Sequence, residues 1–235
     1  MVKIRIDRDR GDAVADSLDF RKVMHHLRDW KLWEWAWLYL LNNVVTYSFG
    51  FFLPIILSGD MGYSTTMAQI LSFPPYVAAA PWMLSTAWFA DRYRKRGLIL
   101  ILNASAAIVG LAMTGFVRSN PAARYAGVFL GVCGCNSNVP TILSYMHNNI
   151  VGQTKRSVAS ALIIGGGAIG GIAASNIFRQ ADAPQYTPAM ITAILTQAVT
   201  IVHVGKNFVV YALANRKADK GTIVIEGQPG FRYTL

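Results

Sequence analysis

Six long segments, apolar on every side, dominate this 235-residue sequence. Each holds at least 20 residues, and together they contain only two charged side chains, Glu34 and Lys206, although the whole chain is 14% charged. A helix of about 20 apolar residues matches the hydrocarbon thickness of a bilayer, whereas a helix of a soluble protein keeps a polar face. The sequence therefore predicts an all-α polytopic membrane protein with six transmembrane helices: 32–57, 67–90, 98–117, 125–147, 158–178 and 189–213.

The basic residues predict the orientation of this bundle. An even number of spans places the arm 1–31 and the tail 214–235 on the same side. That side carries 18 of the 22 lysines and arginines, in the arm, the tail and the connectors 91–97 and 148–157. Because basic residues accumulate on the cytoplasmic side, both termini are expected to be cytoplasmic. The net charge of +10 is therefore read as a topology signal, and no nucleic-acid partner is expected.

No arrangement of residues suggests catalysis, a cofactor or a metal site. The two cysteines, Cys133 and Cys135, lie two positions apart in one span and would point in different directions on a helix. Residues 165–170 match G-x-G-x-x-G, but they lie inside a charge-free span without the strand that a dinucleotide site requires. Small residues four apart instead permit close helix packing. We expect two packing ridges, formed by Gly166, Gly167, Gly170 and Gly171.

Polar side chains lie near the midpoints of the first and fourth spans. Asn43 and Tyr47 belong to the first span, and Asn136 and Asn138 belong to the fourth. Amides and hydroxyls are costly in hydrocarbon unless they face a partner or a wet cavity. Their matched depth favours the wall of a substrate cavity. Hydrogen bonding between helices without a ligand is the alternative.

Two charged features allow more than one interpretation. The connector that starts Asp91-Arg92 and ends Arg96-Gly97 can form a seam that opens and closes, or it can be a solvated cytoplasmic loop. Lys206 lies inside the sixth span and is a functional candidate for that reason. It is also about ten residues from the cytoplasmic end, so its long side chain can reach the interface, which is the interpretation we favour.

Several separated motifs resemble one family. Residues 51–57 (FFLPIIL), 62–64 (GYS), 74–76 (PPY), 91–97 (DRYRKRG), 148–156 (NNIVGQTKR), 182–186 (DAPQY) and 230–233 (GFRY) are similar to fungal major facilitator transporters. The nearest branch is the anion:cation symporters, of the allantoate permease and high-affinity nicotinic acid transporter types. In the family's loop motif, Ala87 and Arg94 stand where glycines are usual.

The resemblance covers only the second half of such a transporter. It implies that the chain is the C-terminal six-helix half of a permease, with the first and fourth spans lining the cavity and the second and fifth forming the seam between halves. It further implies proton-coupled transport of a small carboxylate such as nicotinate or allantoate in the plasma membrane. Asp91, Arg92 and Arg96 would latch the cytoplasmic gate. Expected partners are the lipid bilayer and the first half or another transporter chain. A non-transporting six-helix protein that pairs with another chain is the alternative.

Overall fold

A computed structural model of the chain describes residues 19–59, 61–117, 120–183 and 185–235. These ranges contain α-helices and short 3-10 turns but no strand. The helices are α2 (Phe20–Leu27), α3 (Trp30–Gly59), α4 (Thr65–Tyr93), α5 (Arg96–Phe116), α6 (Pro121–Asn149), α7 (Gln153–Ile177) and α8 (Thr187–Asp219), with 3-10 turns at Gln180–Asp182 and Ile225–Gly227. The basic residues Lys3, Arg5, Arg8 and Arg10 of the predicted arm, and Arg118 of a connector, lie outside the described residues.

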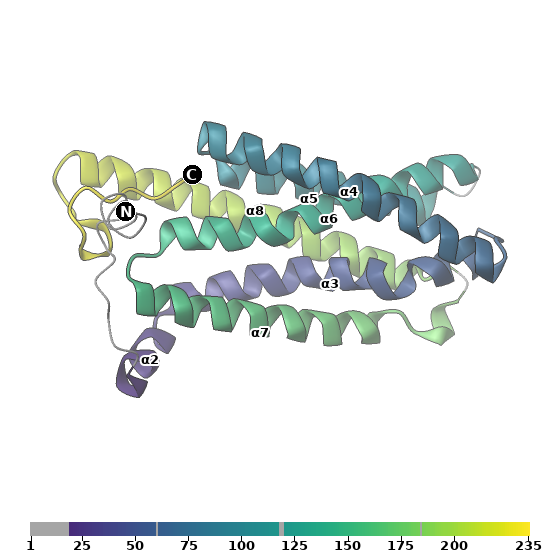
Figure 1. The fold of residues 1–235 in the computed structure, drawn as a ribbon, viewed down its shortest axis with the longest axis horizontal. Coiled ribbons are helices and arrows are strands. Elements are labelled where there is room, and N and C mark those ends of the chain that lie inside the picture. Colours follow the sequence, from purple (N-terminus) through teal and green to yellow (C-terminus); the bar gives the residue numbers. More distant parts are fainter. Residues whose placement is uncertain (1–18, 60, 118–119, 184) are drawn as a thin grey trace, which may run out of the picture.

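Helices α3 to α8 run alternately up and down in one elongated bundle (Figure 1). We call the end where α3 begins and α8 finishes the tail end, and the opposite end the far end. Five of the described helices, α3, α5, α6, α7 and α8, are long and apolar enough to cross a membrane. The predicted second span lies in α4, which has 29 residues but also Pro74, Pro75 and Pro81 and several hydroxyl side chains that make it less apolar.

The prolines inside α4 free backbone carbonyls, and a neighbouring helix satisfies one of them. Pro75 has no N–H, so the carbonyl oxygen of Leu71, four residues earlier, lacks its usual helical donor. The Tyr125 hydroxyl on α6 donates a hydrogen bond to this oxygen at 2.8 Å. Packing against other helices is what makes proline tolerable in a spanning helix.

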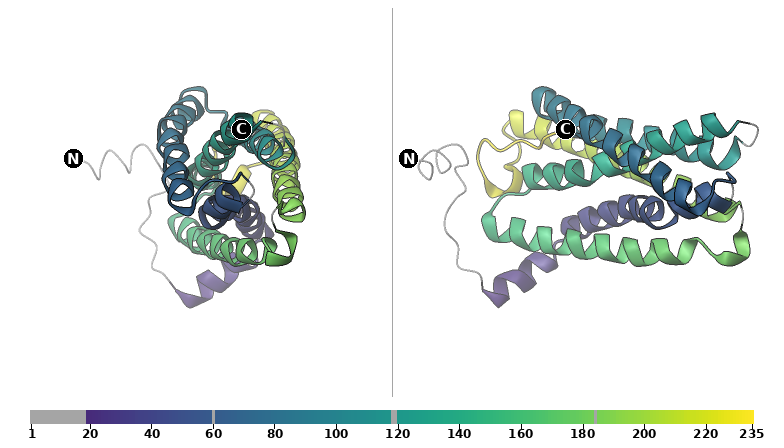
Figure 2. Two further views of the ribbon diagram at one scale, coloured as in Figure 1. Left: turned by 90° about the vertical axis from the view of Figure 1, so that its right-hand side faces the viewer. Right: turned by 45° about the vertical axis from the view of Figure 1, so that its right-hand side comes forward.

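Two sets of helices pack most closely, and α4 lies against a member of each, α3 and α6. Helix α7 packs mainly on α3, and we call these two the α3–α7 pair; α5 packs mainly on α6 and α8, which we call the α5–α6–α8 group. Seen along the bundle, α7 lies on the outer side of α3, away from α5 and α8 (Figure 2). Within the group, a Cβ atom added at Gly110 of α5 would lie 2.2 Å from the Gly131 nitrogen of α6. The two backbones approach so closely because neither helix carries a side chain there.

Candidate functional site

A cavity of about 450 Å³ with a largely apolar lining and several polar side chains lies midway along the bundle, between α3, α4 and α6. Its apolar lining includes Ala79 and Met83 of α4 and Pro140 of α6. The polar side chains that line it are Tyr39, Asn43, Thr46, Tyr47, Tyr76 and Asn136. Three of the four residues predicted to bind substrate therefore meet at one cavity.

The two cavity asparagines keep hydrogen-bonding capacity for a ligand. The Asn43 amide nitrogen donates to the Tyr39 carbonyl oxygen at 2.8 Å, and the Asn136 amide nitrogen donates to the Val132 carbonyl oxygen at 2.9 Å. The Asn136 amide nitrogen also lies 3.6 Å from the Cys135 sulfur, so the amide oxygen of each asparagine is the group that remains for a ligand. A further acceptor is the backbone carbonyl oxygen of Asn136, because Pro140, four residues later, has no N–H to donate to it.

The tyrosines supply hydroxyl groups to the same cavity. The Tyr76 hydroxyl is buried and has no hydrogen-bond partner among the described residues. Tyr47 is 39% exposed, and its ring stacks on Phe51 with centroids 5.6 Å apart. The polar lining carries no formal charge. The cavity can therefore recognise a polar solute by hydrogen bonds, but it holds no countercharge for an ion.

Asn138 does not line this cavity. Its side chain is fully buried, and its amide nitrogen lies 3.4 Å from the Leu100 carbonyl oxygen of α5, to which it donates. Its side-chain oxygen has no hydrogen-bond partner among the described residues. Asn138 thus takes part in helix-to-helix contact, the alternative interpretation of these polar residues.

The four predicted packing glycines lie against α3 and support the cavity wall. A Cβ atom at Gly166 would lie 2.8 Å from the Ala36 carbonyl oxygen, and one at Gly170 would lie 2.6 Å from the Leu40 carbonyl oxygen. Added Cβ atoms at Gly167 and Gly171 would instead meet the rings of Tyr39 and Tyr47, at 2.6 and 3.1 Å respectively. One ridge therefore brings the two backbones together, and the other receives cavity tyrosines. The seam inferred from the family resemblance put these ridges against a missing partner, whereas α3 of the same chain covers them.

The predicted gate residues flank the short turn between α4 and α5: Asp91 and Arg92 lie in the last turn of α4, and Arg96 begins α5. Arg96 and Asp91 form an ion pair, and Arg92 is exposed. Arg94 ends α4 with φ 53°, in the left-handed region. A residue with a Cβ atom is strained there, and glycine is not. The geometry explains why the resembling family favours glycine where this chain has Arg94.

The only two charged residues of the six predicted spans pair with each other. Lys206 of α8 forms an ion pair with Glu34 of α3, and its ammonium nitrogen lies 5.8 Å from the centre of the Trp30 ring. Both partners lie near the tail end of the bundle. The Lys206 side chain therefore reaches toward that end, as the interpretation of an interface-seeking lysine expects. Its partner there is the Glu34 carboxylate, which the sequence did not link to Lys206.

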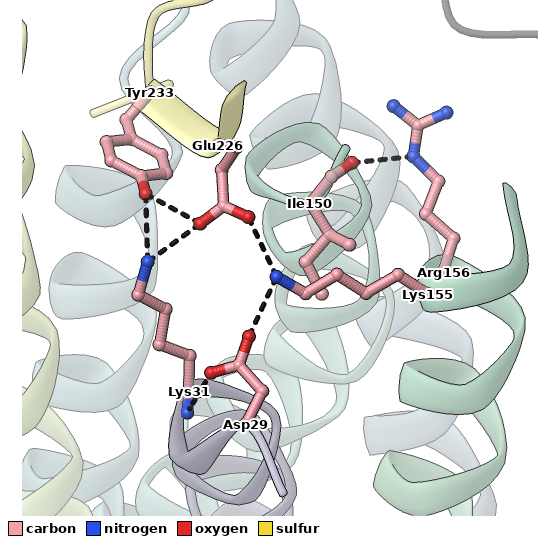
Figure 3. Close-up of polar contacts among 7 residues, drawn as sticks. All are labelled: Asp29, Lys31, Ile150, Lys155, Arg156, Glu226 and Tyr233. Atoms are coloured by element: carbon pink, nitrogen blue, oxygen red, sulfur yellow. Dashed lines mark hydrogen bonds and ion pairs between the residues drawn. The ribbon is translucent and has the colours of Figure 1, made fainter. Parts of the chain in front are cut away.

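A second ionic cluster at the tail end was not predicted (Figure 3). The Glu226 carboxylate lies 2.7 Å from the ammonium nitrogens of both Lys31 and Lys155. Lys155 also lies 2.8 Å from Asp29, and the Tyr233 hydroxyl donates to Glu226 at 3.0 Å. Burial opposes ionisation of Glu226, but the hydrogen bonds from Lys155 and Lys31 outweigh it and lower the pKa of Glu226 to about 2. Two of the family-like motifs contain members of this cluster, Lys155 in 148–156 and Tyr233 in 230–233, but neither motif pointed to Glu226.

No metal site is apparent in the described part of the chain, where no group of three or more His, Cys, Asp or Glu side chains comes together. Cys133 and Cys135 are both buried and free.

The fold defines a class of protein, the helical membrane proteins, and polar side chains of three helices line one cavity in it. Residues 7–175 match the family model described as Major Facilitator Superfamily, which is more than half of the chain, and the protein belongs to that superfamily.

Curated relatives are named as transporters. An uncharacterized transporter of Schizosaccharomyces pombe is 27% identical over 201 residues, which is 82% of this chain and 38% of that protein. The MFS transporter prlL of a fungal species is 28% identical over 235 residues, covering 98% of this chain and 47% of the relative. The high-affinity nicotinic acid transporter of Saccharomyces cerevisiae is 23% identical over 211 residues, 90% of this chain and 39% of the relative. The chain thus spans less than half the length of these relatives, and membrane transport, rather than catalysis, is the activity that the family supports.

Proposed function

We propose that the chain is one six-helix half, the C-terminal one, of a permease that carries a small organic anion across the plasma membrane together with a proton. The observation that carries this proposal is the cavity in which Asn43, Tyr47 and Asn136 converge at mid-bundle. Polar groups at that depth are costly unless a solute or water uses them. Helix α4, the predicted second span, is counted as a spanning helix in addition to the five others, because at about 1.5 Å per residue its 29 residues reach across a bilayer.

The neutral lining of the cavity bears on the coupling ion. A carboxylate transferred from water to a site with no countercharge loses much of its solvation free energy, whereas its protonated form loses far less. The hydroxyl and amide groups on Tyr47, Tyr76 and Asn136 can satisfy a carboxylic acid, which both donates and accepts. We therefore favour uptake of the anion with a proton. Nicotinate is the first solute to test, because one relative is named as its transporter.

Alternating access requires a second half. Major facilitator transporters work by rocking two halves around a site at the midplane, and this chain supplies three of the helices around such a site. The proposed partner is therefore the other six-helix half, whether in the same polypeptide or in another chain. Asp91, Arg92 and Arg96 are proposed as the gate residues at the tail end, and the excess of basic residues supports a cytoplasmic location for that end and for both termini.

Uptake of labelled nicotinate tests this function. A chimera that joins the first six spans of the yeast nicotinic acid transporter to this chain would be expressed in yeast lacking that transporter. Removing one hydrogen-bonding group from the cavity should weaken apparent affinity about tenfold to a hundredfold, so Asn43→Ala and Asn136→Ala should each lower uptake. Asn138→Ala is the matched control: it removes the same group, at the same depth of α6, outside the cavity.

The outcomes separate the alternatives when membrane levels of the variants are equal. Unchanged uptake kinetics in Asn43→Ala and Asn136→Ala would refute the site. A chimera that assembles but carries no nicotinate, allantoate or related acid would favour the second candidate, a non-transporting half that pairs with another chain. The specific observation behind that candidate is that the chain covers only 38% to 47% of the relatives above.

A further inference from the structure

The tail segment, residues 221–235, lies across the tail end of the bundle and contacts both helix sets. On one side the backbone of the segment forms four hydrogen bonds with the α5–α6–α8 group. The Asn215 side chain of α8 exchanges two hydrogen bonds of 2.8 Å with the backbone of Tyr233. The Asn149 side chain of α6 accepts from the Thr234 N–H at 2.7 Å, and the Gly97 N–H of α5 donates to the Leu235 carbonyl oxygen at 3.3 Å.

On the other side the same segment reaches the α3–α7 pair through Glu226. One carboxylate oxygen binds Lys31, near the start of α3, and the other binds Lys155, near the start of α7 (Figure 3). Only 11% of the Glu226 side chain is exposed. Because both oxygens are engaged and shielded, this contact is stronger than an ordinary surface ion pair.

The conformation of the segment is shaped to make these contacts. Glu226 has φ 50°, a left-handed conformation that is strained for a residue with a Cβ atom. The flanking turns use glycine, with φ 71° at Gly227 and 84° at Gly230. Tyr233 stacks on Tyr211 of α8 with ring centroids 4.3 Å apart, and its hydroxyl donates to Glu226. A strained backbone persists only where surrounding contacts hold it in place. At Glu226 these contacts hold the carboxylate between two lysines.

We propose that the tail segment is a strap that holds the α3–α7 pair against the α5–α6–α8 group at the tail end, with Glu226 as its ionic fastening. The strap itself rests on the contacts above. Its consequence for transport rests on the proposed function: a half that rocks as one body must keep α3 and α6, which both line the cavity, in a fixed relative position, and the strap holds them so at the tail end. Glu226 is a positioning residue in this scheme, since it acts through the helices that carry the cavity residues.

Hydrogen exchange of the purified 235-residue chain in lipid nanodiscs tests the strap. In the wild type, the N–H groups of Tyr233 and Thr234 should be protected by Asn215 and Asn149. The Glu226→Gln variant keeps the size of the side chain and removes its charge. Loss of a shielded charged hydrogen bond should speed exchange of residues 221–235 about tenfold to a hundredfold. The first turns of α3 and α7 should also exchange faster.

The matched control is Asp182→Asn. Asp182 is a carboxylate with 17% side-chain exposure that pairs with Arg179 at the far end, so the same chemical change there should leave the tail segment protected. Where Glu226→Gln does not fold, Tyr233→Phe carries the test, because it removes one hydroxyl and keeps the ring stacked on Tyr211; a rise of a few-fold is expected.

The exchange rates of residues 221–235 decide whether the strap exists. Exchange of residues 221–235 that is already fast in the wild type, or that is the same in Glu226→Gln as in Asp182→Asn, overturns the strap. Nicotinate binding measured in the same samples keeps the two proposals apart. Absence of binding in every sample counts against the solute, while the exchange pattern still decides the strap.

Discussion

The closest approach of α7 to the backbone of α3 gives a sharp prediction for the Gly170→Ala variant. Its Cβ atom would lie 2.6 Å from the Leu40 carbonyl oxygen, where ordinary contact begins at 3.4 Å, so α7 or α3 must shift by about 0.8 Å. The neighbour is helix backbone, which cannot rotate away. Overpacking of this kind costs about 1–3 kcal/mol, and the better helix propensity of alanine returns at most about 1 kcal/mol. A net loss of about 1–2 kcal/mol of stability is expected.

Gly165→Ala is the matched control, in the same helix and with the same chemical change. Nothing lies within 4 Å of a Cβ atom at Gly165, so this variant should be neutral or stabilised by up to about 1 kcal/mol. Thermal unfolding in detergent, followed by tryptophan fluorescence, should separate the two variants by about 4–8 °C. Equal midpoints for Gly165→Ala and Gly170→Ala would refute the close α3–α7 packing, and with it the support that the glycine ridge gives to the cavity wall.

Three further outcomes are expected from the same melting assay. Lys206→Met should lower the midpoint, because it leaves Glu34 without its ion-pair partner. Adding Glu34→Gln to this variant should recover part of the loss. If the changes in midpoint of the two single variants simply add up in the double variant, the ion pair is excluded. The Glu226 pKa falls from 4.5 to about 2 in the folded state, so the ionised carboxylate adds up to about 3 kcal/mol to the folding stability above pH 4.5, and this stability is lost as pH falls toward 2. The difference in melting midpoint between wild type and Glu226→Gln should therefore shrink from pH 4.5 to pH 2. A difference that stays constant over this range would contradict the lowered pKa. Arg94→Gly should raise the midpoint by about 2–4 °C, because glycine relieves the backbone strain of the left-handed conformation at this position. Arg92→Gly is the control and should lower the midpoint, because Arg92 lies inside α4. A lower midpoint in both variants would show that Arg94 is not strained.

Hydropathy predicted the helices of this protein well because the bilayer imposes a length and a polarity on each span. The predicted segment 32–57 lies within Trp30–Gly59, and 125–147 lies within Pro121–Asn149. Every helix begins before its predicted segment, and most also end after it, most clearly α8, which runs six residues beyond Leu213 to Asp219; α5 and α7 each end one residue earlier than predicted. Hydropathy locates the part of a helix that lies in hydrocarbon, whereas backbone hydrogen bonding can extend the helix into the polar interface.

Contacts between distant parts of the chain could not be predicted in the same way. Glu34 and Lys206 are 172 positions apart, and Lys31 and Glu226 are 195 apart, so no local pattern links the partners. The identity of the helix that covers the glycine ridges also depends on how α7 docks, which spacing in one helix does not define. Composition identified the residues that need a partner, and only the fold identified the partner.

The outcome for the fourth span shows why depth alone does not define a cavity. Asn136 and Asn138 share a depth, but successive residues of an α-helix are about 100° apart, so side chains two positions apart point in directions about 200° apart. They cannot line one narrow cavity from one straight helix, and the structure puts Asn136 at the cavity and Asn138 against Leu100 of α5. By the same rule Asn43 and Tyr47, four positions apart, share a face, and both line the cavity. Residues at the same depth must therefore also lie on the same face of a helix if they are to contact one solute. Asn138 shares the depth of Asn136 but not its face, which is why Asn138 serves as its control.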